Sequence, residues 1–134
     1  METCELTQIL IVDDSEDDSM LIAHQLRREI PNVTFQRVDC EQDMRLALQE
    51  QGWDLVISDH SMPNFDSVRA LEVLREVRRN VPFIVYSGHY DQEKGLAAMT
   101  GGADDFVYKS NSQRLLPVVR RELRNSRLHR DKEQ

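Results

Sequence analysis

The sequence predicts an α/β fold, a single doubly wound (βα)5 domain built on a parallel five-stranded sheet. Five short strand-like runs alternate with five segments of helical periodicity, and this alternation indicates a parallel sheet with helices on both faces. Runs such as Gln8–Val12 and Leu55–Ile57 are apolar without polar alternation, as in strands that are covered on both sides. A chain of 134 residues suits one domain, which we expect at residues 8–128, with 129–134 as a tail or the start of a linker.

The composition predicts a soluble, acidic protein. Apolar residues make up 40% of the chain, which is enough for a core, and charged residues make up 31%. The net charge of −7 divides into −11 for residues 1–109 and +4 for residues 110–134, and an acidic body disfavours direct nucleic-acid binding. We find no signal-peptide pattern and no run near the roughly 18 apolar residues of a membrane span. Cys4 and Cys40 lack metal-ligand spacing, so we expect reduced thiols in a cytoplasmic protein.

The first half of the chain is predicted to form two strand–helix pairs. Ser15 precedes Asp18 by three residues, a pattern that resembles a capping box and begins a helix that Pro31 closes. Residues 33–38 alternate in polarity, which is typical of an edge strand. A second helix is expected from about residue 41 to 50, with Gly52 ending it. The residues expected to face the core are Ile22, Leu26, Ile30, Met44, Ala47 and Leu48.

The second half continues the alternation. We expect strands at residues 55–57, 83–86 and 105–108, and helices at about 67–80, 92–100 and 112–128. Gly101 and Gly102 stop the middle one of these helices. Pro117 lacks a backbone donor and predicts an irregular first turn in the last helix. The inward-facing positions are expected to be Val68, Leu71, Leu74 or Arg75, Val77 or Arg78, Leu116, Val119 and Leu123.

Five polar residues stand just past the ends of predicted strands, and a parallel sheet brings them to one edge, where open α/β sheets bind ligands. They are Asp13, Asp14, Asp59, Ser87 and Lys109. Three carboxylates at one edge repel one another, and Lys109 offsets only one charge. Mg²⁺ takes oxygen ligands and keeps waters, so it would relieve this repulsion and leave open positions that attract a phosphoryl group. The Ser87 hydroxyl and the Lys109 ammonium can then contact phosphoryl oxygens.

Four motifs carry these residues in order along the chain: Asp13-Asp14, Asp59-His60-Ser61-Met62-Pro63, Ser87-Gly88 and Lys109. Each motif alone is weak, but the order, spacing and strand-end placement of all four resemble the receiver domain of two-component response regulators. The resemblance covers about residues 8–128. It implies the flavodoxin-like form of the predicted fold, with strand order 2-1-3-4-5.

The resemblance also implies a role for each residue of the site. Asp59 would accept a phosphoryl group from a phosphohistidine on a sensor histidine kinase or a histidine phosphotransfer protein. Asp13 and Asp14 would hold Mg²⁺ together with Asp59 and the backbone carbonyl of Ser61. Lys109 would pair first with Asp59 and then with the phosphoryl group, in a reaction that needs mainly positioning and charge neutralisation.

A receiver of this kind would be a bacterial signalling switch, with autocatalytic phosphotransfer and autodephosphorylation, rather than an enzyme that turns over an external metabolite. Ser87 would move toward the phosphoryl group and Phe106 would turn inward as an aromatic switch. The face formed by the predicted helix at 92–100, the strand at 105–108 and the last helix would then bind an output domain or a second copy of the chain. The residues expected to flank the site are His60, Gly88 and His89.

Two positions depart from the family pattern. Receivers usually have glycine where this chain has Ser67, and serine tolerates a positive φ less well, so we expect a different loop there. Receivers usually have a proline with a cis bond where this chain has Ser110. A cis bond before serine would cost about 2.5–4 kcal/mol, so the sequence leaves the Lys109–Ser110 bond open between a trans form with a shifted loop and a strained cis form.

Three other functions are open at the level of sequence. An aspartyl-phosphate phosphatase typically carries a second aspartate two residues after its nucleophile, where this chain has Ser61. A flavodoxin-like cofactor protein needs a glycine- and hydroxyl-rich phosphate loop after its first strand, but residues 13–18 are acidic. A degenerate receiver would act as a phosphorylation-independent protein-interaction module. The sequence also leaves open whether the receiver is freestanding or part of a longer protein.

Overall fold

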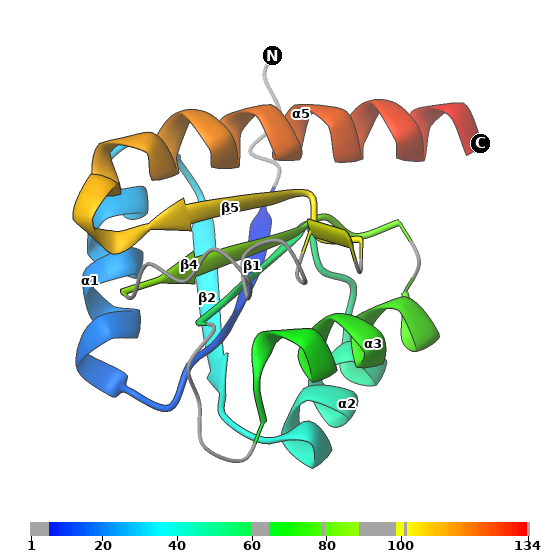
Figure 1. Cartoon of the computed structure of the whole chain (residues 1–134). Helices are drawn as coiled ribbons and strands as arrows, with labels where there is room; N and C mark the ends of the chain where they lie inside the picture. Colours follow the sequence, from blue (N-terminus) through cyan, green and yellow to red (C-terminus); the bar gives the residue numbers. More distant parts are fainter. Residues whose placement is uncertain (1–5, 60–64, 79, 89–98, 101, 134) are drawn as a thin grey trace.

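A parallel sheet of five strands forms the centre of the protein in this computed structural model, which describes residues 6–59, 65–78, 80–88, 99–100 and 102–133 (Figure 1). The strand order is β2-β1-β3-β4-β5, and every neighbouring pair is parallel. The fold class and the strand order expected from the sequence are therefore confirmed. The strands are β1 (Thr7–Val12), β2 (Val33–Val38), β3 (Leu55–Ser58), β4 (Phe83–Ser87) and β5 (Asp105–Tyr108).

Helices pack on both faces of this sheet (Figure 1). The described helices are α1 (Glu16–Arg27), α2 (Glu41–Glu50), α3 (Ser67–Val77), the 3-10 helix η1 (Lys109–Arg114) and α5 (Leu115–Glu133). The helix predicted at 92–100 lies outside the described residues except for Met99 and Thr100, which are helical. Within the described ranges, each helix is too short or too polar to cross a bilayer.

The sheet carries a hydrophobic core on each face. Successive residues of β1 point to opposite sides, so Leu10 joins one cluster of buried side chains and Ile9 joins the other. Helices α2 and α3 cover the first cluster, and α1 and α5 cover the second (Figure 1). Because both faces of β1, β3 and β4 are buried, these strands carry apolar residues on both sides, as their sequences predicted.

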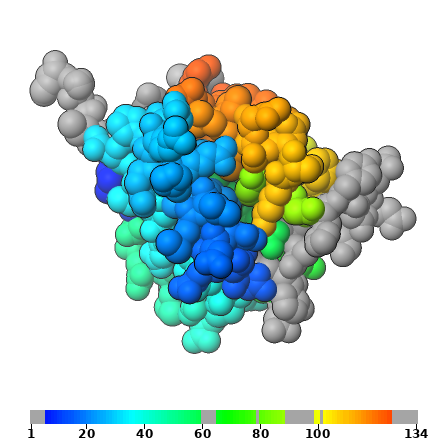
Figure 2. Space-filling view, turned by 90° about the vertical axis from the view of Figure 1, so that its left-hand side faces the viewer, coloured from blue at the N-terminus to red at the C-terminus, as the bar shows by residue number. Residues whose placement is uncertain are grey.

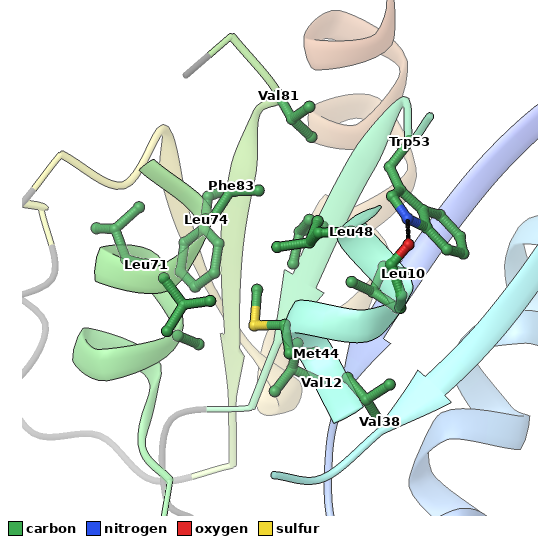
Figure 3. Close-up of a cluster of buried hydrophobic side chains, with 14 of the residues drawn as sticks. Leu10, Val12, Val38, Met44, Leu48, Trp53, Leu71, Leu74, Val81 and Phe83 are labelled. Atoms are coloured by element: carbon green, nitrogen blue, oxygen red, sulfur yellow. Dashed lines mark hydrogen bonds between the residues drawn. The ribbon is translucent and has the colours of Figure 1, made fainter. Parts of the chain in front are cut away.

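Figure 3 shows the cluster under α2 and α3, where Met44 and Leu48 lie close to Leu74 and Phe83. Each of these four side chains is fully buried, which contributes on the order of 1.5–3 kcal/mol apiece. Trp53 packs at the edge of the same cluster, and its Nε1 donates a hydrogen bond of 2.9 Å to the Ala47 carbonyl. The one polar atom of this large side chain therefore has a partner inside the core.

The starts of the helices agree with their sequences. Ser15 is the N-cap of α1, as predicted, and its Oγ accepts a hydrogen bond of 3.1 Å from the Asp18 amide. Asp66 caps α3 in the same way, since its Oδ1 accepts a 3.0 Å hydrogen bond from the Arg69 amide. Ser67 follows this cap as the first residue of α3 with no positive φ, so serine replaces the family's glycine here without backbone strain.

The predicted end of α3 is wrong by three residues. The helix ends at Val77 rather than at 80, and Arg78 has an extended backbone with φ −139°. The apolar stripe runs out at this point, and the Arg78 guanidinium donates instead to the Leu48 carbonyl of α2 at 2.9 Å. Val68 is half-buried rather than part of the inner stripe, because the helix turns the following positions inward. The buried residues of α3 after its first position are Ala70, Leu71, Val73 and Leu74.

The last helix begins later than predicted. Residues 109–114 form η1, which is broken by non-helical angles at Asn111, and α5 starts only at Leu115. Pro117 is then the third residue of α5, where its missing N–H would have no helical partner in any case. Leu115 is fully buried, whereas the predicted Leu116 is only half-buried against the core. The Lys109–Ser110 peptide bond is trans.

Candidate functional site

The strand-end residues meet at one edge of the sheet, as the parallel topology requires. The Asp59 amide donates a hydrogen bond of 2.8 Å to the Val12 carbonyl, so the pairing with β1 continues one residue past β3 and brings Asp59 to the end of β1, where Asp13 follows. Oxygens of Asp13, Asp14 and Asp59 lie within 4.8 Å of one another. Figure 2 looks onto this side of the molecule, where α1 (blue) lies against the segment that follows β5 (orange).

Asp13 is the most deeply buried of the three carboxylates, with 1% of its surface exposed. Its Oδ1 accepts a hydrogen bond of 2.9 Å from the Ser15 amide, and its Oδ2 has no partner. Burial raises the pKa of Asp13 to about 6, assisted by the negative charge of Asp59 and opposed by the Ser15 hydrogen bond. A buried carboxylate oxygen without a partner is costly, so this group is suited to a cation rather than to the core.

These residues fit Mg²⁺. The three carboxylates offer oxygen ligands of the type that this hard cation prefers, and Asp14 is exposed, so waters can complete the coordination. Asp13 also carries the buried carboxylate oxygen without a partner, Oδ2, which a cation could satisfy. Ser61, whose backbone carbonyl was expected to join them, lies outside the described residues, as do His60 and His89.

A second acidic group lies at the start of α2. Atoms of Asp39, Cys40 and Asp43 also come within 4.8 Å of one another. Asp39 and Asp43 are exposed, and the unpartnered buried oxygen found among the described residues belongs to Asp13 instead. The arrangement at Asp39 is therefore a solvated surface group, while the one at Asp13 has the character of a binding site.

Lys109 reaches the site from the end of β5. Its Nζ lies 3.9 Å from Asp59 Oδ1, but it donates a shorter hydrogen bond of 2.9 Å to Asp18 Oδ2 on α1. Burial by itself lowers the pKa of Lys109, but the Asp18 hydrogen bond and the charges of Asp59 and Asp13 outweigh it and raise the pKa above its ordinary value. Lys109 is therefore a permanent positive charge at the site.

Ser87 and Phe106 come from neighbouring strands. Ser87, the last residue of β4, is fully buried and pairs in register with Tyr108, so it lies at the same edge as Lys109. Phe106 is half-buried against the core, and its ring centroid lies 4.9 Å from that of Tyr108. Gly88 lies beside the lysine, since a Cβ there would stand 3.5 Å from Lys109 Cδ, an ordinary van der Waals distance.

Sequence reasoning missed two side chains that contact the site. Asp18 was predicted only as part of the capping box that begins α1, and nothing in the sequence separates it from Glu16 or Asp17 as the partner of Lys109. Arg37 donates a hydrogen bond of 3.1 Å to the Asp13 carbonyl. Its signal was present, because the alternation in β2 places this arginine on the same side as two apolar residues.

Comparison with known proteins gives matches to one family. The model of the response regulator receiver domain family matches residues 9–120. The C4-dicarboxylate transport transcriptional regulatory protein DctD of Pseudomonas aeruginosa is 32% identical over 123 residues, which cover 91% of this chain and 26% of that protein. The chain spans 26% and 53% of the length of the first two curated relatives that it matches.

Solved structures share the fold. The signal receiver domain of an HD domain-containing protein from Pseudomonas fluorescens Pf-5 has a TM-score of 0.84 at 23% identity, over 98% of this chain and 96% of that one. The receiver domain of the sensor histidine kinase PA1611 from Pseudomonas aeruginosa has a TM-score of 0.75 at 20% identity, over 89% and 98%. That domain was solved with a magnesium ion coordinated in its active site cleft. At these identities the likeness concerns the fold alone.

Proposed function

Because this chain belongs to the response regulator receiver domain family, we propose that Asp59 accepts a phosphoryl group from a histidine kinase or a histidine phosphotransfer protein in a Mg²⁺-dependent reaction. One observation carries the proposal. The carboxylates of Asp13, Asp14 and Asp59 converge within 4.8 Å, with the Lys109 ammonium 3.9 Å from Asp59. This charge arrangement suits the transfer of a highly charged group, which depends on positioning and electrostatics.

The proposed transfer forms one bond and breaks one bond. A carboxylate oxygen of Asp59 attacks phosphorus, the bond between phosphorus and the histidine nitrogen of the partner breaks, and that nitrogen keeps the electron pair. Lys109 holds its proton and stabilises the phosphoryl oxygens as a point charge. Mg²⁺, when bound by Asp13, Asp14, Asp59 and the Ser61 carbonyl, offsets the negative charge of the carboxylates and of the incoming group. Water later cleaves the acyl phosphate and restores Asp59.

The phosphorylated residue then acts as a switch. Ser87 moves toward the phosphoryl group, and the half-buried Phe106 turns inward, which changes the surface over β5 and α5. That surface binds an output domain or a second copy of the chain. We place the protein in the bacterial cytoplasm, in a two-component or phosphorelay pathway. It is a switch, not an enzyme with an external substrate.

The alternatives have less support. The chain matches the receiver family, and a degenerate receiver within that family has no support. Asp59, Asp13 and Lys109, the residues that the proposed reaction needs, are all present and close together. The same match to the receiver family leaves the aspartyl-phosphate phosphatase and the flavin-binding protein without support.

Intact-mass spectrometry after treatment with acetyl phosphate tests the proposal. We expect one phosphoryl adduct on the native chain in the presence of Mg²⁺, and none without Mg²⁺ or on Asp59→Ala. An adduct that persists on Asp59→Ala would place the acceptor elsewhere. If neither an adduct nor binding of the phosphoryl mimic beryllofluoride is found on the folded protein, the phosphoacceptor function is wrong.

A further inference from the structure

Lys109 is held most closely by a residue that has no part in the proposed transfer. Its Nζ donates a hydrogen bond of 2.9 Å to Asp18 Oδ2, whereas Asp59 Oδ1 lies 3.9 Å away, beyond hydrogen-bond distance. The contact with Asp18 is a charge-assisted hydrogen bond, and it is therefore the stronger of the two interactions. The Lys109 ammonium is therefore bound more closely to Asp18 on α1 than to the proposed phosphoacceptor Asp59.

The surroundings of Lys109 leave its ammonium between these two carboxylates. The position of a Cβ at Gly88 lies 3.5 Å from Lys109 Cδ, and Nζ lies 5.8 Å from the centroid of the Tyr86 ring. The side chain is 25% exposed, so most of its surface is covered while its ammonium lies between the two carboxylates. Because both carboxylates lie within reach of one ammonium with three rotatable donors, a small rotation exchanges one partner for the other.

The Asp18 carboxylate is not needed to form α1. The N-cap contact of this helix uses the Asp18 amide, which donates to Ser15 Oγ at 3.1 Å. The Asp18 side chain is 43% exposed, and its described hydrogen bond is the one from Lys109. The carboxylate can thus be neutralised while the helix cap stays in place.

We propose that Asp18 is a positioning residue that restrains Lys109 and so weakens the hold of the site on a phosphoryl group at Asp59. This inference rests on the proposed function and adds a residue that tunes it. A phosphoryl group on Asp59 brings new negative charge toward the ammonium, and Asp18 competes with it for the same donor. The negative charge of Asp18 also opposes the phosphoryl group directly, although exposure to solvent screens this repulsion.

Titration with beryllofluoride in the presence of Mg²⁺ tests the inference, with bound fluoride followed by ¹⁹F NMR. Asp18→Asn keeps the shape of the side chain and removes its charge. We expect it to bind beryllofluoride about two- to fivefold more tightly than the native chain, the range of a partly exposed charge pair. With acetyl phosphate as donor, the same variant is expected to show a lower KM with a smaller change in kcat. Asp18→Glu is expected to restore native behaviour.

Asp17→Asn is the matched control. It changes the net charge by the same amount in the same turn of α1, and Asp17 is exposed and makes no contact with Lys109 among the described interactions. We expect its affinity for beryllofluoride to stay at the native value. A gain that is equal in the Asp17 and Asp18 variants would overturn the inference, because it would reflect net charge alone.

Three other outcomes also count against the inference. Unchanged affinity in Asp18→Asn would show that the contact with Lys109 has no effect on the phosphoryl site, and weaker binding would show that Asp18 assists it. If the folded native chain neither binds beryllofluoride nor accepts a phosphoryl group, the proposed function fails and the inference fails with it. If the native chain does both and only the Asp18 comparison fails, the inference alone is wrong.

Discussion

The Arg37 guanidinium donates a hydrogen bond of 3.1 Å to the backbone carbonyl of Asp13. The contact ties the edge strand β2 to the loop that carries the buried carboxylate. The same guanidinium also forms ion pairs with two exposed carboxylates, Glu16 at 3.9 Å and Asp39 at 3.6 Å. Arg37 thus fixes the backbone of a proposed metal ligand without belonging to the metal site.

Arg37→Ala is therefore expected to lower the free energy of unfolding by about 1–2 kcal/mol, because a carbonyl loses a charged donor. Urea unfolding followed by circular dichroism measures the change. Arg37→Lys keeps the charge but loses the planar guanidinium, and it is expected to recover only part of the loss. Native stability in Arg37→Ala would contradict the role.

Asp13 makes the stability of the metal-free protein depend on pH. Its pKa is about 6 in the folded protein, against 3.8 for an ordinary aspartate, so the folded state holds the proton more tightly than the unfolded chain does. The contribution of this group to the free energy of unfolding is complete below 3.8 and is lost as the pH rises through about 6. The loss amounts to roughly 3 kcal/mol at most, at 1.36 kcal/mol for each pKa unit.

Comparison with Asp13→Asn isolates this effect, since the other carboxylates are common to both chains. In urea unfolding without metal, the variant is expected to gain stability relative to the native chain between about pH 4 and pH 7. A difference in stability that does not change with pH would show that Asp13 does not titrate in this range. The variant should also bind Mg²⁺ more weakly, because it loses a charged ligand.

Asp14→Asn should reduce the stabilisation that Mg²⁺ gives to the fold. A cation that binds only the folded chain at about 100 times its Kd adds about 2.7 kcal/mol to the free energy of unfolding, which appears as a higher Tm. We expect the shift in Tm on addition of Mg²⁺ to be smaller in Asp14→Asn than in the native chain. Asp17→Asn, which alters an exposed carboxylate of α1, should keep the native shift. If both variants lose the same part of the Tm shift, the stabilisation by Mg²⁺ depends on the net charge of the protein rather than on binding at this site.

Leu74→Ala should destabilise the fold far more than a similar truncation at the surface. Leu74 is fully buried between α3 and the sheet, so the variant loses apolar burial and leaves a cavity, at a cost of about 2–5 kcal/mol. Leu46→Ala, at a position that is 50% exposed on α2, should change the free energy of unfolding by less than about 0.5 kcal/mol. Similar effects in the two variants, measured by urea unfolding, would contradict this account of the core.

The fold and the carboxylates of the site were accessible from the sequence because strand ends, apolar runs and caps are local signals. Asp13 follows an apolar run directly and Asp59 follows one after a single serine, and the parallel pairing of β1 with β3 brings the two residues to the same edge of the sheet. The sheet order did not follow from local signals, and it came from the resemblance to receivers.

The contacts that the sequence did not predict are long-range choices between similar side chains. Lys109 contacts Asp18 rather than Asp17 because neighbouring residues of a helix point in different directions, and only Asp18 points toward the end of β5. A shift of α1 by one residue would change which aspartate makes the contact. The late start of α5 has a similar origin. Residues 112–114 satisfy a helical pattern, but the break at Asn111 and the burial of Leu115 fix a later first turn.

The strand order also divides the site into two parts, carried by strands whose local unfolding requires different free energies. Asp13 and Asp59 follow strands with hydrogen-bonded neighbours on both sides, whereas Lys109 follows β5, an edge strand that pairs only with β4. The local opening that allows amide hydrogen exchange costs less free energy in an edge strand than in a central strand, because fewer neighbours hold the edge strand. Amide exchange should therefore be slower at Ile11 and Ile57 than at Val107, although all three residues are buried. The carboxylates would then form the rigid half of the site, and the lysine the half that can adjust to what binds there.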